Sequence, residues 1–207
     1  MRETVTELSA KETLLQALRE KWDRRYRAAE ATRPGAARVL SENLHLLPAS
    51  GKALDLACGR GGNALLLATT DLQIQAWDLS TVGIEHLATM AQQESLAIDT
   101  AVRDVISEPP TVGSFDVIVV SYFLERSLSP LLCSALRPGG LLFYQTFVRD
   151  RLGSGGPSNV DFLLAENELL SLFSSLILRV YREEGSIGDA AQGFRNEAML
   201  VAQRPYS

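Results

Sequence analysis

Short apolar runs alternate with amphipathic segments along most of this chain, so that strands and helices are predicted in turn. Short apolar runs bounded by turn residues predict strands at 52–56, 72–77, 97–102, 114–120 and 141–147. Apolar residues at helical spacing predict helices at 61–70, 81–95, 124–136 and 166–174. Two further apolar segments, 176–182 and 197–202, are predicted to be the last strands.

This order of elements predicts the fold class. Right-handed crossovers through helices produce a parallel sheet that helices cover on both faces. The last two strands are joined by a glycine-containing loop, which predicts an antiparallel hairpin at one edge. We therefore expect an α/β protein with a seven-stranded, mostly parallel sheet, an antiparallel C-terminal hairpin and helices on both faces.

The residues that precede the first strand are predicted to be helical. Between 11 and 29, apolar side chains recur at helical spacing, namely Leu14, Leu15, Leu18, Trp22 and Tyr26. A second helix is predicted to begin at Pro34 and to end before Pro48, because proline suits a first helical turn but cannot continue a helix. We expect an N-terminal helical cap over 1–48 and a sheet-containing domain over 49–207, packed as one unit.

The most specific chemical signal lies at 53–64, which reads Ala-Leu-Asp-Leu-Ala-Cys-Gly-Arg-Gly-Gly-Asn-Ala. An apolar strand reaches Asp55, a turn passes through Gly59 and Gly61, and an apolar helical segment follows. Glycine has no Cβ and tolerates positive φ, so such a turn lets the backbone approach a ligand closely. A strand, a glycine turn and a helix in this order predict the first unit of a nucleotide-binding α/β fold.

This stretch resembles the Asp-x-x-x-Gly-x-Gly motif of class I S-adenosylmethionine (SAM)-dependent methyltransferases. The resemblance implies a Rossmann-like class I methyltransferase fold, with 49–207 as the SAM-binding domain, SAM as cofactor and S-adenosylhomocysteine (SAH) as product. Gly59, Gly61 and Ala64 also fit the dinucleotide-binding pattern. A dinucleotide, however, brings a pyrophosphate to the helix N-terminus, where Asp55 would repel it, whereas SAM carries a sulfonium and no phosphate. A glycine turn without a ligand, with Asp55 only capping the helix, stays open as an alternative.

Acidic residues also follow the second and third predicted strands. Asp78 comes about 20 residues after the glycine turn, which is the spacing of the ribose-binding acid in nucleotide folds. Its two oxygens match two neighbouring hydroxyl donors, although Asp78 could instead cap the next helix. By resemblance to the methyltransferases, Asp104 would accept the adenine amino group, while Val105 and Leu79 would pack on the two faces of the ring.

The same resemblance places Ser121 and Tyr122, after the fourth strand, near the methionine moiety of SAM. The full set of predicted cofactor-binding residues is Trp22, Tyr26, Asp55, Ala57, Gly59, Gly61, Asn63, Asp78, Leu79, Asp104, Val105, Ser121 and Tyr122.

Further segments resemble the bacterial tellurite-resistance-type methyltransferases. They are the element from Trp22 to Tyr26, which covers the cofactor in that family, the Ala-Trp-Asp of 76–78, and the stretches 162–169 and 195–202. Trp22 and Tyr26 could also be a core-packing stripe of an amphipathic helix. The chain departs from that family in the loop 149–159, so the resemblance does not carry tellurite over as the substrate.

Residues on the fifth strand, on the loop that follows it and on the final hairpin are candidates for acceptor binding: Tyr144, Arg149, Arg151 and Arg195. Arginine can bind an anionic group through two parallel hydrogen bonds, but exposed arginines that serve solubility are an equal alternative. No catalytic residue is predicted, because methyl transfer mainly requires a positioned nucleophile and the exclusion of water. A base is needed only when the acceptor holds a proton at neutral pH.

The composition of the chain indicates which classes of binding partner and which cellular location to expect. At 207 residues, with 46% hydrophobic and 22% charged residues, the chain suits one soluble domain. Its net charge of −5 argues against nucleic-acid binding. Two distant cysteines, Cys58 and Cys133, predict neither a disulfide framework nor a metal site. Without a signal-like or bilayer-spanning apolar run, we expect a cytoplasmic monomer or homodimer with no membrane partner.

These observations together predict a SAM-dependent methyltransferase that acts on a small molecule with a soft heteroatom or an anionic group. The alternative is a SAM-binding regulatory or scaffold protein without catalysis, because an intact binding motif does not establish turnover. The acidic net charge disfavours methylation of protein or RNA. Ser121 and Tyr122 stand where an Asn/Asp-Pro-Pro-Tyr motif would be, which counts against methylation of exocyclic base amines.

Overall fold

A computed structural model describes residues 5–29, 32–153 and 155–206 of the chain and contains one seven-stranded sheet. The strands are β1 (Gly51–Leu56), β2 (Leu72–Asp78), β3 (Ile98–Val102), β4 (Phe115–Ser121), β5 (Leu136–Phe147), β6 (Ile177–Glu183) and β7 (Glu197–Gln203). Their order across the sheet is β3-β2-β1-β4-β5-β7-β6. Only β7 runs against its neighbours, because it pairs antiparallel with both β5 and β6. The predicted mostly parallel sheet with a C-terminal antiparallel hairpin is confirmed.

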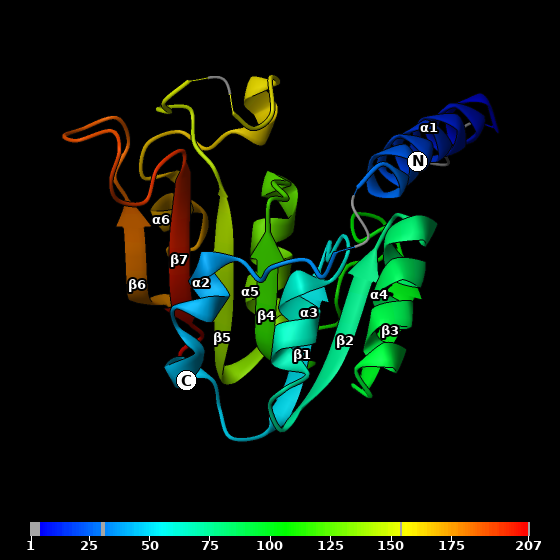
Figure 1. Cartoon of the computed structure of the whole chain (residues 1–207), viewed down its shortest axis with the longest axis horizontal. Helices are drawn as coiled ribbons and strands as arrows, with labels where there is room; N and C mark the ends of the chain where they lie inside the picture. Colours follow the sequence, from blue (N-terminus) through cyan, green and yellow to red (C-terminus); the bar gives the residue numbers. More distant parts are fainter. Residues whose placement is uncertain (1–4, 30–31, 154, 207) are drawn as a thin grey trace.

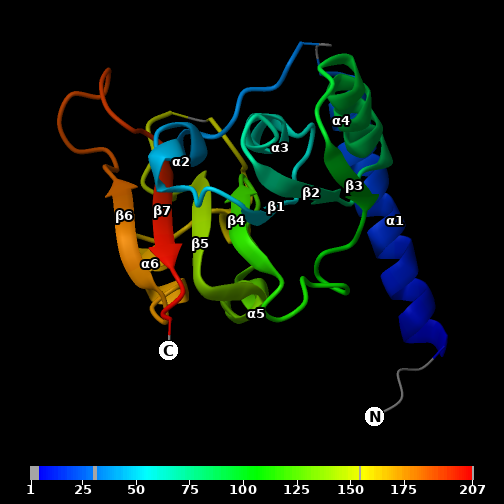
Figure 2. The ribbon, with the colours of Figure 1, turned by 90° about the horizontal axis from the view of Figure 1, so that it is seen from below.

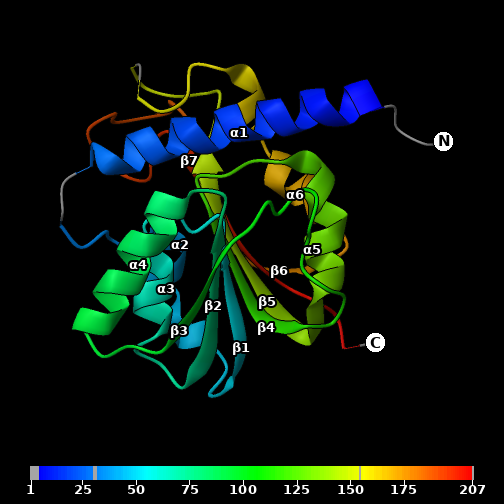
Figure 3. The same cartoon turned by 90° about the vertical axis from the view of Figure 1, so that its right-hand side faces the viewer.

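The described helices form two layers, one on each face of the sheet (Figures 1 and 2). The α-helices are α1 (Val5–Arg27), α2 (Arg38–Ser41), α3 (Gly62–Leu67), α4 (Thr81–Gln93), α5 (Ser129–Ala135) and α6 (Glu168–Leu172). Short 3₁₀ turns are η1 (Leu44–Leu46), η2 (Arg126–Leu128) and η3 (Val160–Phe162). Helices α2, α3 and α4 cover one face and α5 and α6 the other, while α1 lies across the carboxyl ends of the parallel strands (Figure 3). None of the described helices is both long and apolar enough to cross a membrane.

Successive residues of the central strands point to opposite faces of the sheet and build two separate cores. Leu54 and Leu56 join the core under α5 and α6. Ala53 belongs to the core under α2, α3 and α4. By this alternation Asp55 points toward the α3 side, where it is fully buried. Its placement beneath the start of α3 therefore follows from the strand pattern.

Several predicted boundaries are wrong, most clearly those of two predicted helices. The predicted helix 124–136 begins later, because Pro130 sits in the first turn of α5, and β5 already starts at Leu136. The register shifts from the pair Phe115 and Leu136 to the pair Val117 and Leu141, so 137–140 bulge within the strand. The predicted helix 34–47 is reduced to the short segments α2 and η1.

The expected division into a cap (1–48) and a domain (49–207) stays a prediction. Segment 34–41 nevertheless contacts the sheet and α3 directly. The carbonyl oxygen of Gly35 lies 2.2 Å from the position that a Cβ at Gly62 would take. Glycine at position 62 therefore permits the chain before α2 to pack on the first residue of α3.

We predict that Gly62→Ala lowers the free energy of unfolding by about 1–3 kcal/mol, because the new methyl group overlaps the Gly35 carbonyl and the packed segment must move. Urea unfolding followed by circular dichroism measures the change. Gly35→Ala is the matched control, since a Cβ at Gly35 meets no atom within 4 Å. Equal stability of the two variants would contradict the prediction.

Candidate functional site

The glycine turn lies at the carboxyl ends of β1 and β2, where ligands bind in parallel α/β sheets (Figure 1). The Cys58 amide donates to the Trp77 carbonyl at 3.0 Å, and the Gly61 amide donates to the Cys58 carbonyl at 2.8 Å. Ala57, Gly59 and Gly61 adopt positive φ angles of 54°, 56° and 82°. The turn thus runs in a left-handed path that presents backbone rather than side chains to the crevice.

Asp78 joins the glycine turn to the end of β2. One carboxylate oxygen accepts a hydrogen bond from the Gly59 amide at 2.7 Å, and the other accepts from the Ser80 amide at 2.8 Å. The cap of α4 is Ser80, whose hydroxyl oxygen accepts from the Gly83 amide. The alternative that Asp78 caps this helix is therefore wrong. Burial raises the pKa of Asp78 above its ordinary value, and the two amide bonds partly offset this effect.

The carboxylate of Asp55 lies under the first turn of α3. It accepts hydrogen bonds from the Ala64 amide at 3.0 Å and from the Asn63 side-chain amide at 3.2 Å. Burial raises the pKa of Asp55 to about 7, the two hydrogen bonds lower it, and nearby Asp78 adds to the rise. An acid thus occupies the helix start at which a phosphate group would otherwise bind.

Asn63 connects the glycine turn to the next strand end. Its amide nitrogen also donates to the Ser121 hydroxyl at 2.8 Å, and its oxygen accepts from the Ala37 amide at 2.9 Å. The contacts of this buried side chain tie the ends of β1 and β4 to the segment before α2. The structure therefore brings together two of the predicted site residues, Asn63 and Ser121.

Helix α1 packs on the glycine turn through Tyr26, and Trp22 stacks on Tyr26. Their rings stack with centroids 5.7 Å apart, and the Tyr26 hydroxyl lies 2.9 Å from the position of a Cβ at Gly59. Burial and the neighbouring Asp78 raise the pKa of the Tyr26 hydroxyl. Leu14, earlier in the same helix, is 72% exposed. The apolar residues of α1 are thus not all core residues, and the buried end of the helix covers the turn.

Polar contacts hold α1 in this place. The Asp23 carboxylate accepts a hydrogen bond from the Ser80 hydroxyl and another from the Val82 amide at 3.2 Å. Arg19 donates to the Leu79 carbonyl at 3.3 Å. The helix is therefore fixed to the segment that follows Asp78, directly beside the glycine turn.

The residues predicted for an adenine ring lie at the end of β3. The Asp104 carboxylate accepts from the Ile106 amide at 3.1 Å and from the Ser107 hydroxyl at 2.7 Å. Val105 is buried, and Leu79 is half-buried at the neighbouring strand end. Asp104 is held in a local turn with its side chain partly open to solvent.

A second polar cluster lies beyond Ser121, at the ends of β4, β5 and β7. Gln145 is fully buried; its oxygen accepts from the Val39 amide at 2.7 Å and its nitrogen donates to the Tyr122 hydroxyl at 3.0 Å. The same nitrogen donates to the Glu197 carboxylate at 2.5 Å. Sequence reasoning missed Gln145 and Glu197. The available signals were a polar residue inside the apolar run 141–147 and an acid at the start of an apolar strand.

Four residues are predicted to bind the acceptor. Three of them either lie apart from the cluster of Tyr122, Gln145 and Glu197 or form hydrogen bonds within their own loop. Tyr144 is 3% exposed in the core under α5 and α6, where its hydroxyl donates to the Phe123 carbonyl. Arg151 donates to the carbonyls of Gly155 and Pro157 at 2.7 and 2.8 Å. Arg149 is exposed and close enough to Glu168 to help lower the pKa of that carboxyl.

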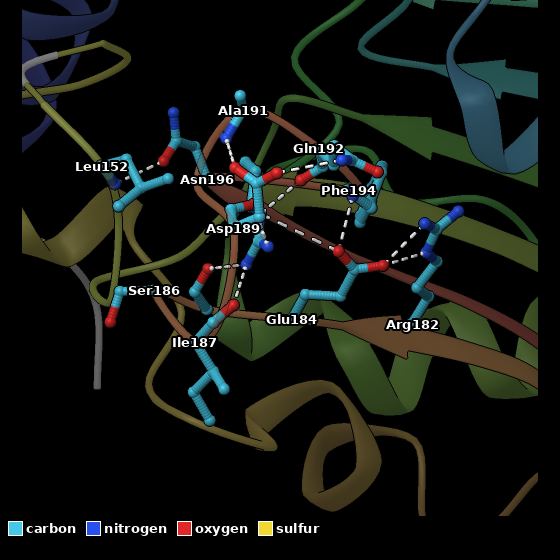
Figure 4. A network of polar contacts seen from close by, with 12 residues as sticks. Leu152, Arg182, Glu184, Ser186, Ile187, Asp189, Ala191, Gln192, Phe194 and Asn196 are labelled. Carbon is cyan, nitrogen blue, oxygen red and sulfur yellow. Dashed lines mark hydrogen bonds and ion pairs between the residues drawn. The ribbon is translucent and has the colours of Figure 1, made fainter.

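Arg195, the fourth, holds together the loop between β6 and β7, of which Figure 4 labels Ile187, Asp189 and Gln192. Its guanidinium donates to four backbone carbonyls, those of Gly185, Ile187, Asp189 and Gln192. This use of its donors leaves little capacity for a bidentate bond to an anion. The structure thus gives Arg195 a loop-organising place and does not bring the four predicted acceptor residues together.

Comparison with known proteins identifies the relatives of this chain. The family model described as "Tellurite resistance protein TehB" matches residues 31–190. A probable S-adenosyl-L-methionine-dependent methyltransferase TehB of Haemophilus influenzae is 30% identical over 140 residues, which are 64% of this chain and 48% of the relative. A ubiquinone biosynthesis O-methyltransferase of Burkholderia orbicola is 30% identical over 115 residues, 51% of this chain and 48% of the relative. The chain spans about half the length of these curated relatives.

Solved structures share the fold. The crystal structure of TehB from Haemophilus influenzae has a TM-score of 0.67 at 23% identity and covers 88% of this chain and 67% of that one. A structure reported for conversion of a disulfide bond into a thioacetal group during echinomycin biosynthesis has a TM-score of 0.68 at 20% identity. The match covers 91% of this chain and 93% of that one. The crystal structure of the [4+2]-cyclase SpnF has a TM-score of 0.64 at 18% identity, and the match covers 82% of this chain and 79% of that one. At these identities the likeness shows the fold alone, and chemistry has to be argued from the site.

The buried Asp55 predicts a pH dependence of stability. Its pKa of about 7 in the folded protein exceeds the ordinary value, so the folded state keeps a proton that the unfolded chain loses. We therefore expect the contribution of Asp55 to the free energy of unfolding to fall between about pH 4 and 7, by at most about 4 kcal/mol. Urea unfolding across this range, with Asp55→Asn as reference, measures it. Parallel pH curves for the two proteins would contradict the assignment.

For Arg195 we predict a local effect. Arg195→Ala removes four hydrogen bonds to loop carbonyls, so amide hydrogen exchange in 185–194 should accelerate at least about tenfold. Mass spectrometry of peptic fragments follows this exchange. Arg179→Ala is the matched control, because the guanidinium of Arg179 lies on β6 and bonds only to the Gln203 side chain among the described residues. Unchanged exchange in Arg195→Ala would refute the loop-organising place of this side chain.

Proposed function

The chain belongs to the family of the tellurite resistance protein TehB, and from this premise we propose that it is a SAM-dependent methyltransferase with a small-molecule acceptor. The observation that carries the proposal is the Asp55 carboxylate beneath the helix that follows the glycine turn. A sulfonium cofactor without phosphate suits this acid, whereas a pyrophosphate would be repelled by it.

The donor set of the crevice fits SAM. Each oxygen of Asp78 accepts one backbone amide, which leaves lone pairs that can accept the two ribose hydroxyls. Asp104 at the end of β3 offers a carboxylate for the adenine amino group, with Leu79 and Val105 beside it. The left-handed turn at Gly59 and Gly61 supports close approach of the amino-acid part. When bound, SAM supplies a methyl group activated by its positive sulfur.

The remaining predicted cofactor residues support the same arrangement. Ser121 and Tyr122 follow β4, next to Asn63, and are proposed to face the methionine part. Trp22 and Tyr26 are proposed to cover the bound cofactor, because Tyr26 already packs on Gly59 and Trp22 stacks on Tyr26. A cover of this kind excludes water from the methyl group and favours transfer to the acceptor over hydrolysis.

The acceptor is proposed to be a small molecule rather than a nucleic acid, since the net charge is −5. We also propose a cytoplasmic monomer or homodimer. A second candidate is SAM binding without methyl transfer, as in a regulatory or scaffold protein, because the same fold also occurs in a protein of another activity, the [4+2]-cyclase SpnF.

Calorimetry with SAH tests cofactor binding. We predict a dissociation constant in the micromolar range, about −8 kcal/mol, and weakening of at least about 30-fold in Asp78→Ala, which loses the ribose acceptor. Asp99→Ala is the control, because its carboxylate bonds to Gln75 on the far part of β2. Binding of NAD in place of SAH would contradict the proposal.

Transfer of a radiolabelled methyl group from SAM to small-molecule acceptors separates the two candidate functions. Methyl transfer in a protein that binds SAH supports the enzyme. SAH binding without transfer to any acceptor would favour the regulatory or scaffold protein.

A further inference from the structure

The polar cluster of Tyr122, Gln145 and Glu197 begins at Tyr122, the last of the predicted cofactor residues, and continues along the sheet edge toward β7. Ser121, which Asn63 contacts, pairs with Gln145 in the β4–β5 register. Phe147, at the end of β5, pairs with Glu197 at the start of β7. If the methionine part lies at Ser121 and Tyr122, as the proposed function requires, the next side chains toward β7 are those that an acceptor would meet.

Glu197 is oriented within this cluster by two donors. The Gln145 side chain and the Tyr122 hydroxyl both donate to the same carboxylate oxygen, Oε2. Among the described residues, the hydrogen bonds of Glu197 leave Oε1 without a donor. A carboxylate with one oxygen fixed and the other open can accept a hydrogen bond, and then a proton, from a bound molecule.

The charges around the cluster disfavour an anionic acceptor. Arg38 is the cation that acts on both Glu197 and Tyr122, and its guanidinium already pairs with Glu42 at 2.6 Å and lies over the Phe194 ring. Arg195 and Arg151 are bonded to carbonyls of their own loops. An oxyanion at this place would therefore meet the Glu197 carboxylate, and the charge of Arg38 that could compensate it is shared with Glu42 and Glu197.

An aromatic surface lies beside the carboxylate. Tyr122 is 47% exposed, and its ring centroid is 5.2 Å from that of Phe147. Gly156, in the segment after β5, packs on Phe147, since a Cβ at Gly156 would lie 2.9 Å from the Phe147 ring. A flat, apolar molecule can pack on such a surface. The rings of Tyr122 and Phe147 therefore suit a planar acceptor better than a compact hydrated ion.

The state of the two ionisable groups agrees with this arrangement. Burial raises the pKa of Tyr122 to about 12, with Glu197 adding to the rise, so the phenol keeps its proton and remains a donor. Burial also raises the pKa of Glu197, while the bonds from Gln145 and Tyr122 and the charge of Arg38 lower it. A carboxylate with a raised pKa is a stronger base than an exposed one.

Resting on the proposed function, we propose that Glu197, Tyr122 and Phe147 form the acceptor subsite, and that the acceptor is an uncharged planar molecule with a hydroxyl group, whose proton Glu197 takes. In the transfer, a lone pair of the hydroxyl oxygen forms the bond to the methyl carbon of SAM. The bond from that carbon to sulfur breaks, and its electron pair stays on sulfur. The hydroxyl proton passes to Oε1 of Glu197. Gln145 positions the carboxylate.

Binding of two probes to the SAH complex tests the class of acceptor. Catechol is planar, uncharged and protic, whereas tellurite is an oxyanion. By calorimetry we expect catechol to bind and Tyr122→Ala to weaken its binding at least about tenfold, through loss of the stacking surface. Tellurite should give no heat above dilution. Tighter binding of tellurite than of catechol, or no binding of catechol, would overturn the proposal.

Methyl transfer to catechol tests the base. The wild-type kcat should rise with pH as Glu197 loses its proton. Glu197→Gln should keep its melting temperature and SAH affinity but lose at least about 100-fold in kcat, and this rise should be absent. Tyr122→Phe removes a hydrogen bond that lowers the pKa of Glu197, so it should move that rise to higher pH. The matched control is Glu183→Gln, because Glu183 also accepts from a tyrosine, Tyr181, but contacts Asn167 next to α6. It should keep full activity.

The outcomes separate the two proposals. Catechol methylation with an unchanged rate and pH profile in Glu197→Gln would overturn the role of Glu197 and leave the proposed function standing. Failure of the wild-type protein to bind SAH would overturn the proposed function and this inference together.

Discussion

The contact on which the site depends is the one between the Asp55 carboxylate and the first turn of α3. The carboxylate is fully buried and accepts the Ala64 amide and the Asn63 side chain. Through Asn63 the same contact reaches Ser121 at the end of β4. It therefore fixes the helix start, aligns two strand ends and places an acidic group where phosphate-binding folds present free amides. The proposal of a cofactor without phosphate rests on this one interaction.

Much of the fold could be predicted because its elements carry local signals. Each parallel strand is a short apolar run between turn residues, and all seven predicted strands are present. The errors lie where tertiary contacts decide the local structure. The segment 137–140 looks like a turn that ends a helix, yet it bulges within β5, with Arg137 held by Asp116 at 2.7 Å. A contact between residues so far apart in sequence leaves no mark in local periodicity.

The candidate site divides in the same way. Asp55, Gly59 and Asp78 could be found because they stand at strand ends with the spacing of a known motif. In the structure the Gly59 amide donates to Asp78, and Asp55 is close enough to Asp78 for the charge of Asp78 to raise the pKa of Asp55. Glu197 could not be found, because its partners Gln145 and Tyr122 come from two other strands. Arg151 and Arg195 present the opposite difficulty. Their charge suggests that they bind an anionic ligand, but their N–H groups donate to backbone carbonyls of their own loops.

Similar sheets occur in proteins as different as TehB and the [4+2]-cyclase SpnF. The reaction type and the choice of acceptor would therefore be set by the loops outside the shared fold. In this chain the loops 149–159 and 184–196 are bonded to each other, through Asp150 with the Ser186 amide and Asn196 with the Leu152 amide. Glu197 directly follows Asn196 in the sequence. The two loops and the start of β7 therefore form one connected unit. A change in either loop can move the acceptor side of the crevice while the Asp55 contact, on strands nearer the centre of the sheet, stays in place.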